Sequence, residues 1–227
     1  MQYTILGSTV PAVEVTLNRG ESMYTQSGGM AWQTEGIQMS TNARGGVLKG
    51  IGRMFAGESL FMANYRAEKD GAVIAFSSTA PGSIVPVNIG QTPGMIVQKG
   101  SFICAQDSVT LETAFTKKLS SGFFGGEGLI MQRLGGSGYA FLEVDGDAVE
   151  KVLAPGEILK VDTGNVVAFD STVKYEVETV KGVGNILFGG EGLFLTKLTG
   201  PGRIVLQTMN FAEFVGRVAN MMPSSGN

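Results

Sequence analysis

One short phrase occurs three times along this chain, and its recurrence limits the fold more than any other feature of the sequence. The pattern is F-x-G-E-x-L, followed each time by an apolar residue, and it begins at Phe55, Phe124 and Phe188. The last two copies read FFGGEGLIM and LFGGEGLFL, and Gly190 − Gly126 gives a spacing of 64. A phosphate loop, a catalytic turn and a structural repeat would each explain one such phrase, so the surroundings of the copies must decide.

The surroundings repeat as well. An upstream strand-and-turn phrase and a downstream apolar phrase accompany every copy, and their marker glycines are Gly20, Gly100 and Gly164 upstream and Gly82, Gly138 and Gly202 downstream. The first unit is longer because it carries insertions. A chemical motif rarely repeats together with its whole environment, so we interpret the phrase as the mark of a repeated fold. We expect one domain, 1–227, with β repeats at about 1–80, 81–137 and 138–209.

Short β-rich runs bounded by glycine, proline and aspartate support an all-β chain. The clearest are AVIAF (72–76), SIVPVNI (83–89), MIVQ (95–98), YAFLEV (139–144), EILKV (157–161), VKYEVETV (173–180) and RIVLQTM (203–209). The 34 glycines fit many tight turns, since glycine adopts positive φ without steric cost. Cys104 lies in an apolar run and should be a buried, inert thiol. Trp32 should fill the core together with Met23, Met30 and Met39.

Only the C-terminus has a helical pattern, which we place at 210–222. Its apolar residues recur at helical spacing on one face, and they are Phe211, Phe214, Val215, Val218 and Met221. Asn210 has the chemistry of an N-cap, with Glu213 three residues later, and Pro223 ends the pattern. Such a helix would cover a sheet edge or join a subunit interface.

The composition narrows the chemistry. The chain has no histidine and a single cysteine, which removes the commonest general base, the usual catalytic triads and multi-cysteine zinc sites. The phosphate-loop pattern G-x-x-x-x-G-K-[ST] is absent. A net charge of −3 argues against a nucleic-acid footprint. We see neither a signal peptide nor a transmembrane segment, and we expect a cytoplasmic protein without a cofactor.

The glutamates of the three phrases, Glu58, Glu127 and Glu191, are equivalent by repeat. Around a threefold axis they would form a ring of oxygen ligands for Mg²⁺ or Ca²⁺. The alternative is that each carboxylate accepts hydrogen bonds from its own turn or pairs with a nearby lysine. We favour this second interpretation, because equivalent acids in a repeat are as often far apart as close.

A basic, glycine-rich, apolar segment precedes each copy, and its cations are Lys49, Arg53, Lys118 and Lys181. Together these segments would make a binding face for a peripheral membrane surface, an anionic ligand or a protein partner. The alternative is ordinary connectors whose apolar residues pack underneath while the lysine stems extend to water. The modest number of cations favours connectors.

At these residues the sequence resembles the mitochondrial-biogenesis family named after a fungal altered-inheritance-of-mitochondria protein. The resemblance covers nearly the whole chain, and it is carried by Leu17-x-x-Gly20-Glu21, Gly28-Gly29-Met30, the three repeated phrases and Gly200-Pro201-Gly202. It implies a fold like the tryptophan-responsive RNA-binding attenuator protein, with three β repeats around a pseudo-threefold axis in the double-stranded β-helix group. It brings no established catalytic residues and no established substrate.

We therefore expect a non-enzymatic binding or assembly protein with a protein partner that the sequence does not identify. Two alternatives stay open: a binder or enzyme that holds a divalent metal through carboxylates, and nucleic-acid binding by analogy of fold alone. Charged residues make up 16% of the chain, against about 25% in typical proteins, which fits a chain that hides surface in an assembly. Closed symmetric assemblies are common, so we expect a homo-oligomer, with a trimer as the leading size.

Overall fold

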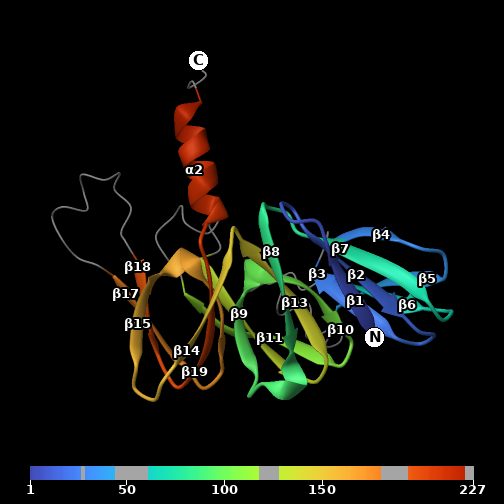
Figure 1. Ribbon diagram of the computed structural model, residues 1–227, viewed down its shortest axis with the longest axis horizontal. Helices are drawn as coiled ribbons and strands as arrows, with labels where there is room; N and C mark the ends of the chain where they lie inside the picture. The colour runs from blue at the N-terminus through green and yellow to red at the C-terminus, as the bar shows by residue number, and fades with distance from the viewer. Residues whose placement is uncertain (27–28, 44–60, 118–127, 180–193, 223–227) are drawn as a thin grey trace.

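The computed structural model describes residues 1–26, 29–43, 61–117, 128–179 and 194–222, and it is built from β-strands (Figure 1). The predicted all-β class is confirmed, and each strand run named from the sequence overlaps a strand, with differences of at most two residues at the ends. The first part of the chain contains β1 (Gln2–Leu6), β2 (Ala12–Leu17), β3 (Ser22–Gln26), β4 (Met30–Gln33), β5 (Ile37–Ala43), β6 (Phe61–Ala67) and β7 (Ala72–Ser77).

The middle part contains β8 (Gly82–Asn88), β9 (Met95–Gln98), β10 (Phe102–Gln106), β11 (Val109–Lys117), β12 (Leu129–Gly136) and β13 (Tyr139–Asp145). The last part contains β14 (Ala148–Leu153), β15 (Ile158–Asp162), β16 (Val166–Asp170), β17 (Lys174–Thr179), β18 (Phe194–Thr199) and β19 (Gly202–Gln207). Single turns of 3₁₀-helix lie at Ile89–Gln91 (η1), Lys99–Ser101 (η2) and Thr163–Asn165 (η3). The turns η2 and η3 each connect two strands that take part in neighbouring sheets.

The strands form four antiparallel sheets. Sheet A has the order β1-β2-β7-β4, sheet B β5-β6-β3-β10-β13-β8, sheet C β11-β12-β9-β16-β19-β14 and sheet D β15-β18-β17. Among the described residues none of these sheets closes on itself, so the structure shows several open sheets. The threefold repeat around an axis stays a prediction at the level of the fold.

The sheets are stacked in a row, with sheet D at the left of Figure 1 and sheet A at the right. Each gap between neighbouring sheets holds one apolar cluster, because every strand sends alternate side chains to each face. Phe76 and Phe141 are fully buried between sheets A and B, Leu134 and Leu142 between B and C, and Phe169 between C and D. The two six-stranded sheets are therefore covered on both faces, whereas A and D form the ends of the stack.

The pairing of the strands contains a recurrent irregularity. A β-bulge interrupts the register between Met30 and Trp32 in β4, between Phe102 and Cys104 in β10, and between Val166 and Ala168 in β16. Each bulge accommodates one extra residue opposite the partner strand. In each of these three strands the bulge therefore lies in the pairing with one neighbouring strand, which is β7, β13 or β19.

Trp32 corrects one expectation from the sequence. Met23 is fully buried as expected, but Trp32 is 44% exposed on the edge strand β4, and Met39 is 54% exposed. The physical reason is that β4 has a neighbour on one side only, β7. Cys104 is fully buried as predicted, and burial raises the pKa of its thiol well above the ordinary value.

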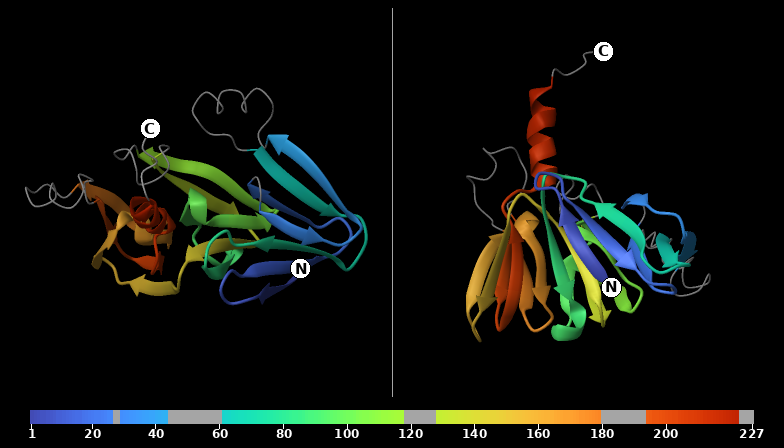
Figure 2. Two further views of the ribbon diagram at one scale, coloured as in Figure 1. Left: turned by 90° about the horizontal axis from the view of Figure 1, so that it is seen from above. Right: turned by 45° about the vertical axis from the view of Figure 1, so that its right-hand side comes forward.

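The C-terminal helix is present as α2 (Phe211–Met221), within the range predicted for it. The side chain of Asn210 accepts a hydrogen bond from Glu213 N–H at 3.2 Å, which confirms the N-cap. The helix projects away from the stacked sheets (Figure 2). Its apolar face is exposed, with Val215 at 47%. It therefore covers no sheet edge of its own chain. In the described part of the chain no helix is long and apolar enough to span a membrane.

Candidate functional site

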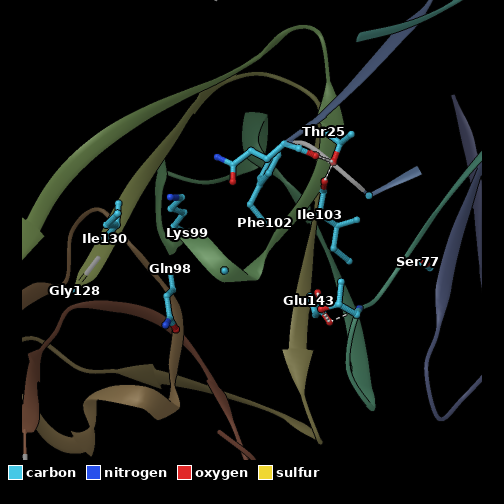
Figure 3. A pocket seen from close by; sticks show the side chains of 13 residues that line it. Thr25, Ser77, Gln98, Lys99, Phe102, Ile103, Gly128, Ile130 and Glu143 are labelled. Atoms are coloured by element: carbon cyan, nitrogen blue, oxygen red, sulfur yellow. Dashed lines mark hydrogen bonds between the residues drawn. The ribbon is translucent and has the colours of Figure 1, made fainter. Parts of the chain in front are cut away.

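A hollow lies where two strands from distant parts of the chain meet. Strand β3 pairs with β10, and we call this pairing the first joint; β9 pairs with β16, and we call that pairing the second joint. A cavity of about 420 Å³ opens at the first joint (Figure 3). Its size falls within the range of small-molecule sites, which are about 300–1,000 Å³.

Both sides of the first joint contribute to the wall of this cavity. Phe102, Ile103 and Ile130 supply apolar surface, and hydroxyl and amide side chains supply polar groups between them. The hydroxyl of Thr25 donates to the carbonyl of Ile103 at 2.6 Å and so ties β3 to β10 across the joint. Gly29 permits this contact, because a Cβ at that position would lie 2.7 Å from the Thr25 hydroxyl.

Glu143 is the buried acid of the cavity wall, with 8% of its surface exposed. Its Oε1 accepts hydrogen bonds from Thr79 N–H at 2.7 Å, Ala80 N–H at 2.9 Å and the Thr79 hydroxyl at 3.0 Å. Its Oε2 has only a long contact of 3.3 Å with the same hydroxyl. One carboxylate oxygen is therefore saturated, and the other keeps acceptor capacity.

Two glutamines at the strand ends around the cavity carry unsatisfied atoms. Within the described ranges, the buried Nε2 of Gln26 and the buried Oε1 of Gln98 have no hydrogen-bond partner. Both residues line the cavity. Buried polar atoms in folded proteins are nearly always paired, so unpaired ones beside a cavity are typical of a site that takes a polar occupant.

A smaller cavity of about 240 Å³ adjoins the first and reaches the base of α2. Gln207 lies in its wall, accepting from Asp145 N–H at 3.1 Å and donating to the carbonyl of Gly164 at 2.8 Å. Asn210 and Phe211 enter this cavity from the start of the helix. The Asp145 carboxylate accepts from Phe211 N–H at 3.0 Å, and partial burial raises the pKa of Asp145 while that bond opposes the rise.

The residues proposed from the sequence as sites fall outside the described part of the chain. They are the repeated glutamates Glu58, Glu127 and Glu191 and the cations Lys49, Arg53, Lys118 and Lys181. Both alternatives for each set therefore stay predictions. Among the described residues no group of three or more acids and thiols is arranged to hold a metal ion.

Sequence reasoning missed Glu143, although a signal was present. In YAFLEV the side chains of Tyr139, Phe141 and Glu143 share one face, since alternate residues of a strand point the same way. Phe141 is buried, so an acid two residues later on the same face is an acid directed into the fold. The alternation was used to predict a strand but not to ask why one inward position is charged.

Comparisons with known proteins place the chain among uncharacterized bacterial relatives. The family profile described as "Mitochondrial biogenesis AIM24" matches residues 3–209. An uncharacterized protein of Streptococcus pyogenes serotype M6 is 30% identical over 236 residues, covering 100% of this chain and 93% of that protein. A crystal structure of a Streptococcus pyogenes protein superposes with a TM-score of 0.78 at 25% identity, covering 97% of this chain and 99% of the other.

Proposed function

The chain belongs to the AIM24 mitochondrial-biogenesis family, and on that premise we propose that it is a non-enzymatic protein that assembles with copies of itself through its two end sheets. The observation that carries this proposal is the number and order of strands in the four sheets. Sheets B and C each contain six strands, whereas A and D, at the ends of the stack, contain four and three.

The six-stranded sheets each consist of two three-stranded halves. Sheet B joins β5-β6-β3 to β10-β13-β8 at the first joint, and sheet C joins β11-β12-β9 to β16-β19-β14 at the second. Sheet D, read as β17-β18-β15, has the order of the first half, and β4-β7-β2 of sheet A has the order of the second half. Sheet D of one copy and sheet A of the next therefore make a complete sheet when β15 pairs with β4.

Aligned in this way, the chain divides into three equivalent units, β2–β7, β8–β13 and β14–β19. Three of the four described bulges support the alignment, because they fall in the third strand of every unit at Met30/Trp32, Phe102/Cys104 and Val166/Ala168. The fourth bulge, at Thr113/Phe115 in β11, has no counterpart in the described registers of β5 and β17. Strand β13 pairs with β8 and β10, so this proposal places the second boundary near 146, later in the chain than the boundary at 137 expected from the sequence.

Exposure distinguishes the unpaired edges from the paired ones. Trp32 on β4 is 44% exposed, whereas Cys104 and Ala168, at the same place in the other units, are fully buried at the two joints. On β15, Ile158 is 53% exposed. Edge strands that offer unpaired backbone groups and apolar side chains are templates for addition of another strand.

The free backbone groups of the two edges also match in register. Thr34 N–H donates to Val73 on β7, so by alternation the N–H of Gln33 points to the free side of β4. Gly200 N–H donates to the carbonyl of Glu157, so the N–H of Lys160 points to the free side of β15. The internal joints pair Ala105 with Tyr24 and Phe169 with Ile96, and the equivalent pair between copies is Gln33 with Lys160.

The same joint used between copies is heterologous, since β4 and β15 are different surfaces. A heterologous joint makes a ring when the rotation closes and a filament when it does not. Closure pairs both end edges, β4 and β15, of every copy, and we propose a closed homotrimer. Ring formation adds a partner strand only to sheets A and D. The first and second joints, which lie within one chain, are therefore the same in the single chain and in the ring.

Proline at the outward-facing positions tests this assembly. Gln33→Pro and Lys160→Pro each remove one free-edge N–H and add a ring that obstructs a partner strand, while the bonds to β7 and β18 remain. Val152→Pro is the matched control: Val152 is 77% exposed on the edge strand β14, and Thr208 N–H bonding to Asp147 implies that the N–H of Val152 also points outward.

Light scattering gives the outcome. The native chain and Val152→Pro should have a mass three times 23.8 kDa, and both edge variants should fall to 23.8 kDa with unchanged β-sheet circular dichroism. A native chain that is monomeric at micromolar concentration would end the proposal. So would folded edge variants that keep the native mass.

A further inference from the structure

Glu143 and Gln207 occupy the same place in neighbouring units, and the difference between them indicates what the cavity at the first joint binds. The registers align them, because Phe141 pairs with Cys104 and Val205 pairs with Ala168, and each of the two residues lies two positions further along its strand. This alignment comes from the joints inside one chain. The inference that follows rests on the equivalence of the units and not on self-assembly.

Gln207 uses both ends of its amide. Its Oε1 accepts from Asp145 N–H, and its Nε2 donates to the carbonyl of Gly164 in η3. The side chain thus bridges the end of β13 to the 3₁₀ turn that leads into the second joint. The amide can make both hydrogen bonds of this bridge because it carries an acceptor, Oε1, and a donor, Nε2.

Glu143 reproduces only half of that bridge. Its Oε1 accepts from Thr79 N–H, and Thr79 is the equivalent of Asp145. The Gly100 carbonyl in η2 is the equivalent of the Gly164 carbonyl, and Gly100 and Glu143 both line the cavity. A carboxylate has no N–H to offer to that carbonyl. By equivalence with Gly164, we infer that the Gly100 carbonyl faces Glu143 Oε2, so that the first joint has two acceptors where the second joint has a donor and an acceptor.

The rest of the wall carries buried polar atoms of both kinds. Among the described residues the Oε1 of Gln98 is an acceptor without a partner and the Nε2 of Gln26 is a donor without one, and both residues line the same cavity. Lys99 also lines the cavity, and its side chain stands apart from Glu143 in Figure 3. At the second joint the corresponding space is entered by Asn210 and Phe211 from the chain itself. At the first joint the structure describes no such segment, and the cavity measures about 420 Å³.

We propose that this cavity binds a small molecule with a primary ammonium group on an apolar body. The ammonium donates to Glu143 Oε2 and to the Gly100 carbonyl, in the place that the Gln207 amide fills at the second joint. The apolar body lies against Phe102, Ile103 and Ile130. A cation is favoured over a neutral donor because hydrogen bonds to a buried carboxylate are stronger when the donor is charged.

A matched pair of probes tests the ammonium. 2-Phenylethylamine and 2-phenylethanol share the apolar body and differ in the charged donor. By calorimetry at neutral pH the amine should bind the native protein at least about tenfold more tightly than the alcohol, the difference expected from one charge-assisted hydrogen bond. Equal binding of the two probes, or no binding of the amine at millimolar concentration, would overturn the proposal.

Glu143→Gln tests the residue. The new amide should donate to the Gly100 carbonyl as Gln207 does to Gly164, so the fold should persist and amine binding should be lost. Glu213→Gln is the control with the same change of charge: its carboxylate pairs with Arg217 on the exposed helix, and amine binding should be retained. If Glu143→Gln binds the amine as tightly as the native chain, the assignment is wrong; if the variant unfolds, the comparison of amine with alcohol on the native chain still decides.

Binding and assembly are separable in this design. The first joint lies within one chain, so Lys160→Pro should bind the amine with native affinity even where its mass has fallen to that of one chain. Loss of assembly with intact binding, or the reverse, identifies which of the two proposals has failed.

Discussion

Asp145 holds the first turn of α2 at a cost that depends on pH. Its carboxylate accepts from Phe211 N–H at 3.0 Å, and partial burial raises the pKa of Asp145 from 3.8, opposed by that hydrogen bond. The folded chain therefore binds this proton more tightly than the unfolded chain. It follows that the free energy of unfolding decreases as pH rises from 3.8 through the raised pKa, and the full cost is present at neutral pH.

The variant Asp145→Asn should remove this dependence, because its Oδ1 keeps the acceptor for Phe211 N–H and carries no charge. We expect Asp145→Asn to melt at a higher temperature than the native chain at pH 7. The advantage should shrink as pH falls toward 3.8, which thermal unfolding followed across that range would show. An advantage that grows on acidification would contradict the sign of the pKa shift.

Single residues show where sequence reasoning succeeds and where it stops. Cys104 was correctly predicted to be buried, because an apolar run in a covered sheet leaves few other places for a small thiol. Trp32 was wrongly expected in the core, because its apolar character says nothing about whether β4 has a neighbour on both sides. Glu143 was overlooked, since its meaning depends on an oxygen that only the three-dimensional hydrogen-bond pattern leaves partly free.

The helix α2 makes few contacts with the sheets, so its stability should be local. Two contacts within the helix stabilise it locally. Glu213 N–H donates to the side chain of Asn210 at the N-cap, and the Glu213 carboxylate pairs with Arg217 one turn later at 2.6 Å. Asn210→Ala should cost the helix about 1 kcal/mol, whereas Asn210→Ser keeps a capping oxygen and should cost little.

Hydrogen exchange separates this local effect from a global one. In Asn210→Ala the amides of α2 should exchange faster by roughly fivefold, which corresponds to about 1 kcal/mol, while the amides of the sheets are unchanged. Faster exchange throughout sheets B and C would show instead that the helix is coupled to the whole fold.

Strands and the helix were within reach of the sequence, whereas their pairing was not. Alternation, glycine and proline marked the strands VKYEVETV and RIVLQTM, and Asn210 with Pro223 bounded the helix. Pairing such as β3 with β10 joins residues far apart in the chain, and many registers satisfy the same alternation. The recurrent glycine phrase indicated repetition. Only the strand orders of the four sheets show that A and D have fewer strands than B and C.

At the scale of the whole molecule, the two ends of the stack are different, and this difference determines how copies can join. Sheets B and C are complete and covered on both faces, and the chain ends in two different half sheets, A and D. A self-complementary contact, β4 with β4 for example, would pair two identical edges and stop at a dimer. The proposed contact pairs β15 of one copy with β4 of the next, so blocking one of these edges leaves the other edge of the same chain able to pair.

Mixing the two blocked chains tests this difference. Gln33→Pro retains a free β15, and Lys160→Pro retains a free β4, so one chain of each kind should join once and expose only blocked edges afterwards. Light scattering of the equimolar mixture should therefore give twice 23.8 kDa, while each variant alone gives a single chain. A self-complementary β4 contact would instead let Lys160→Pro dimerise alone, and a β15 contact of that kind would do the same for Gln33→Pro. A mixture that stays monomeric would show that the ends of the stack do not join by strand addition.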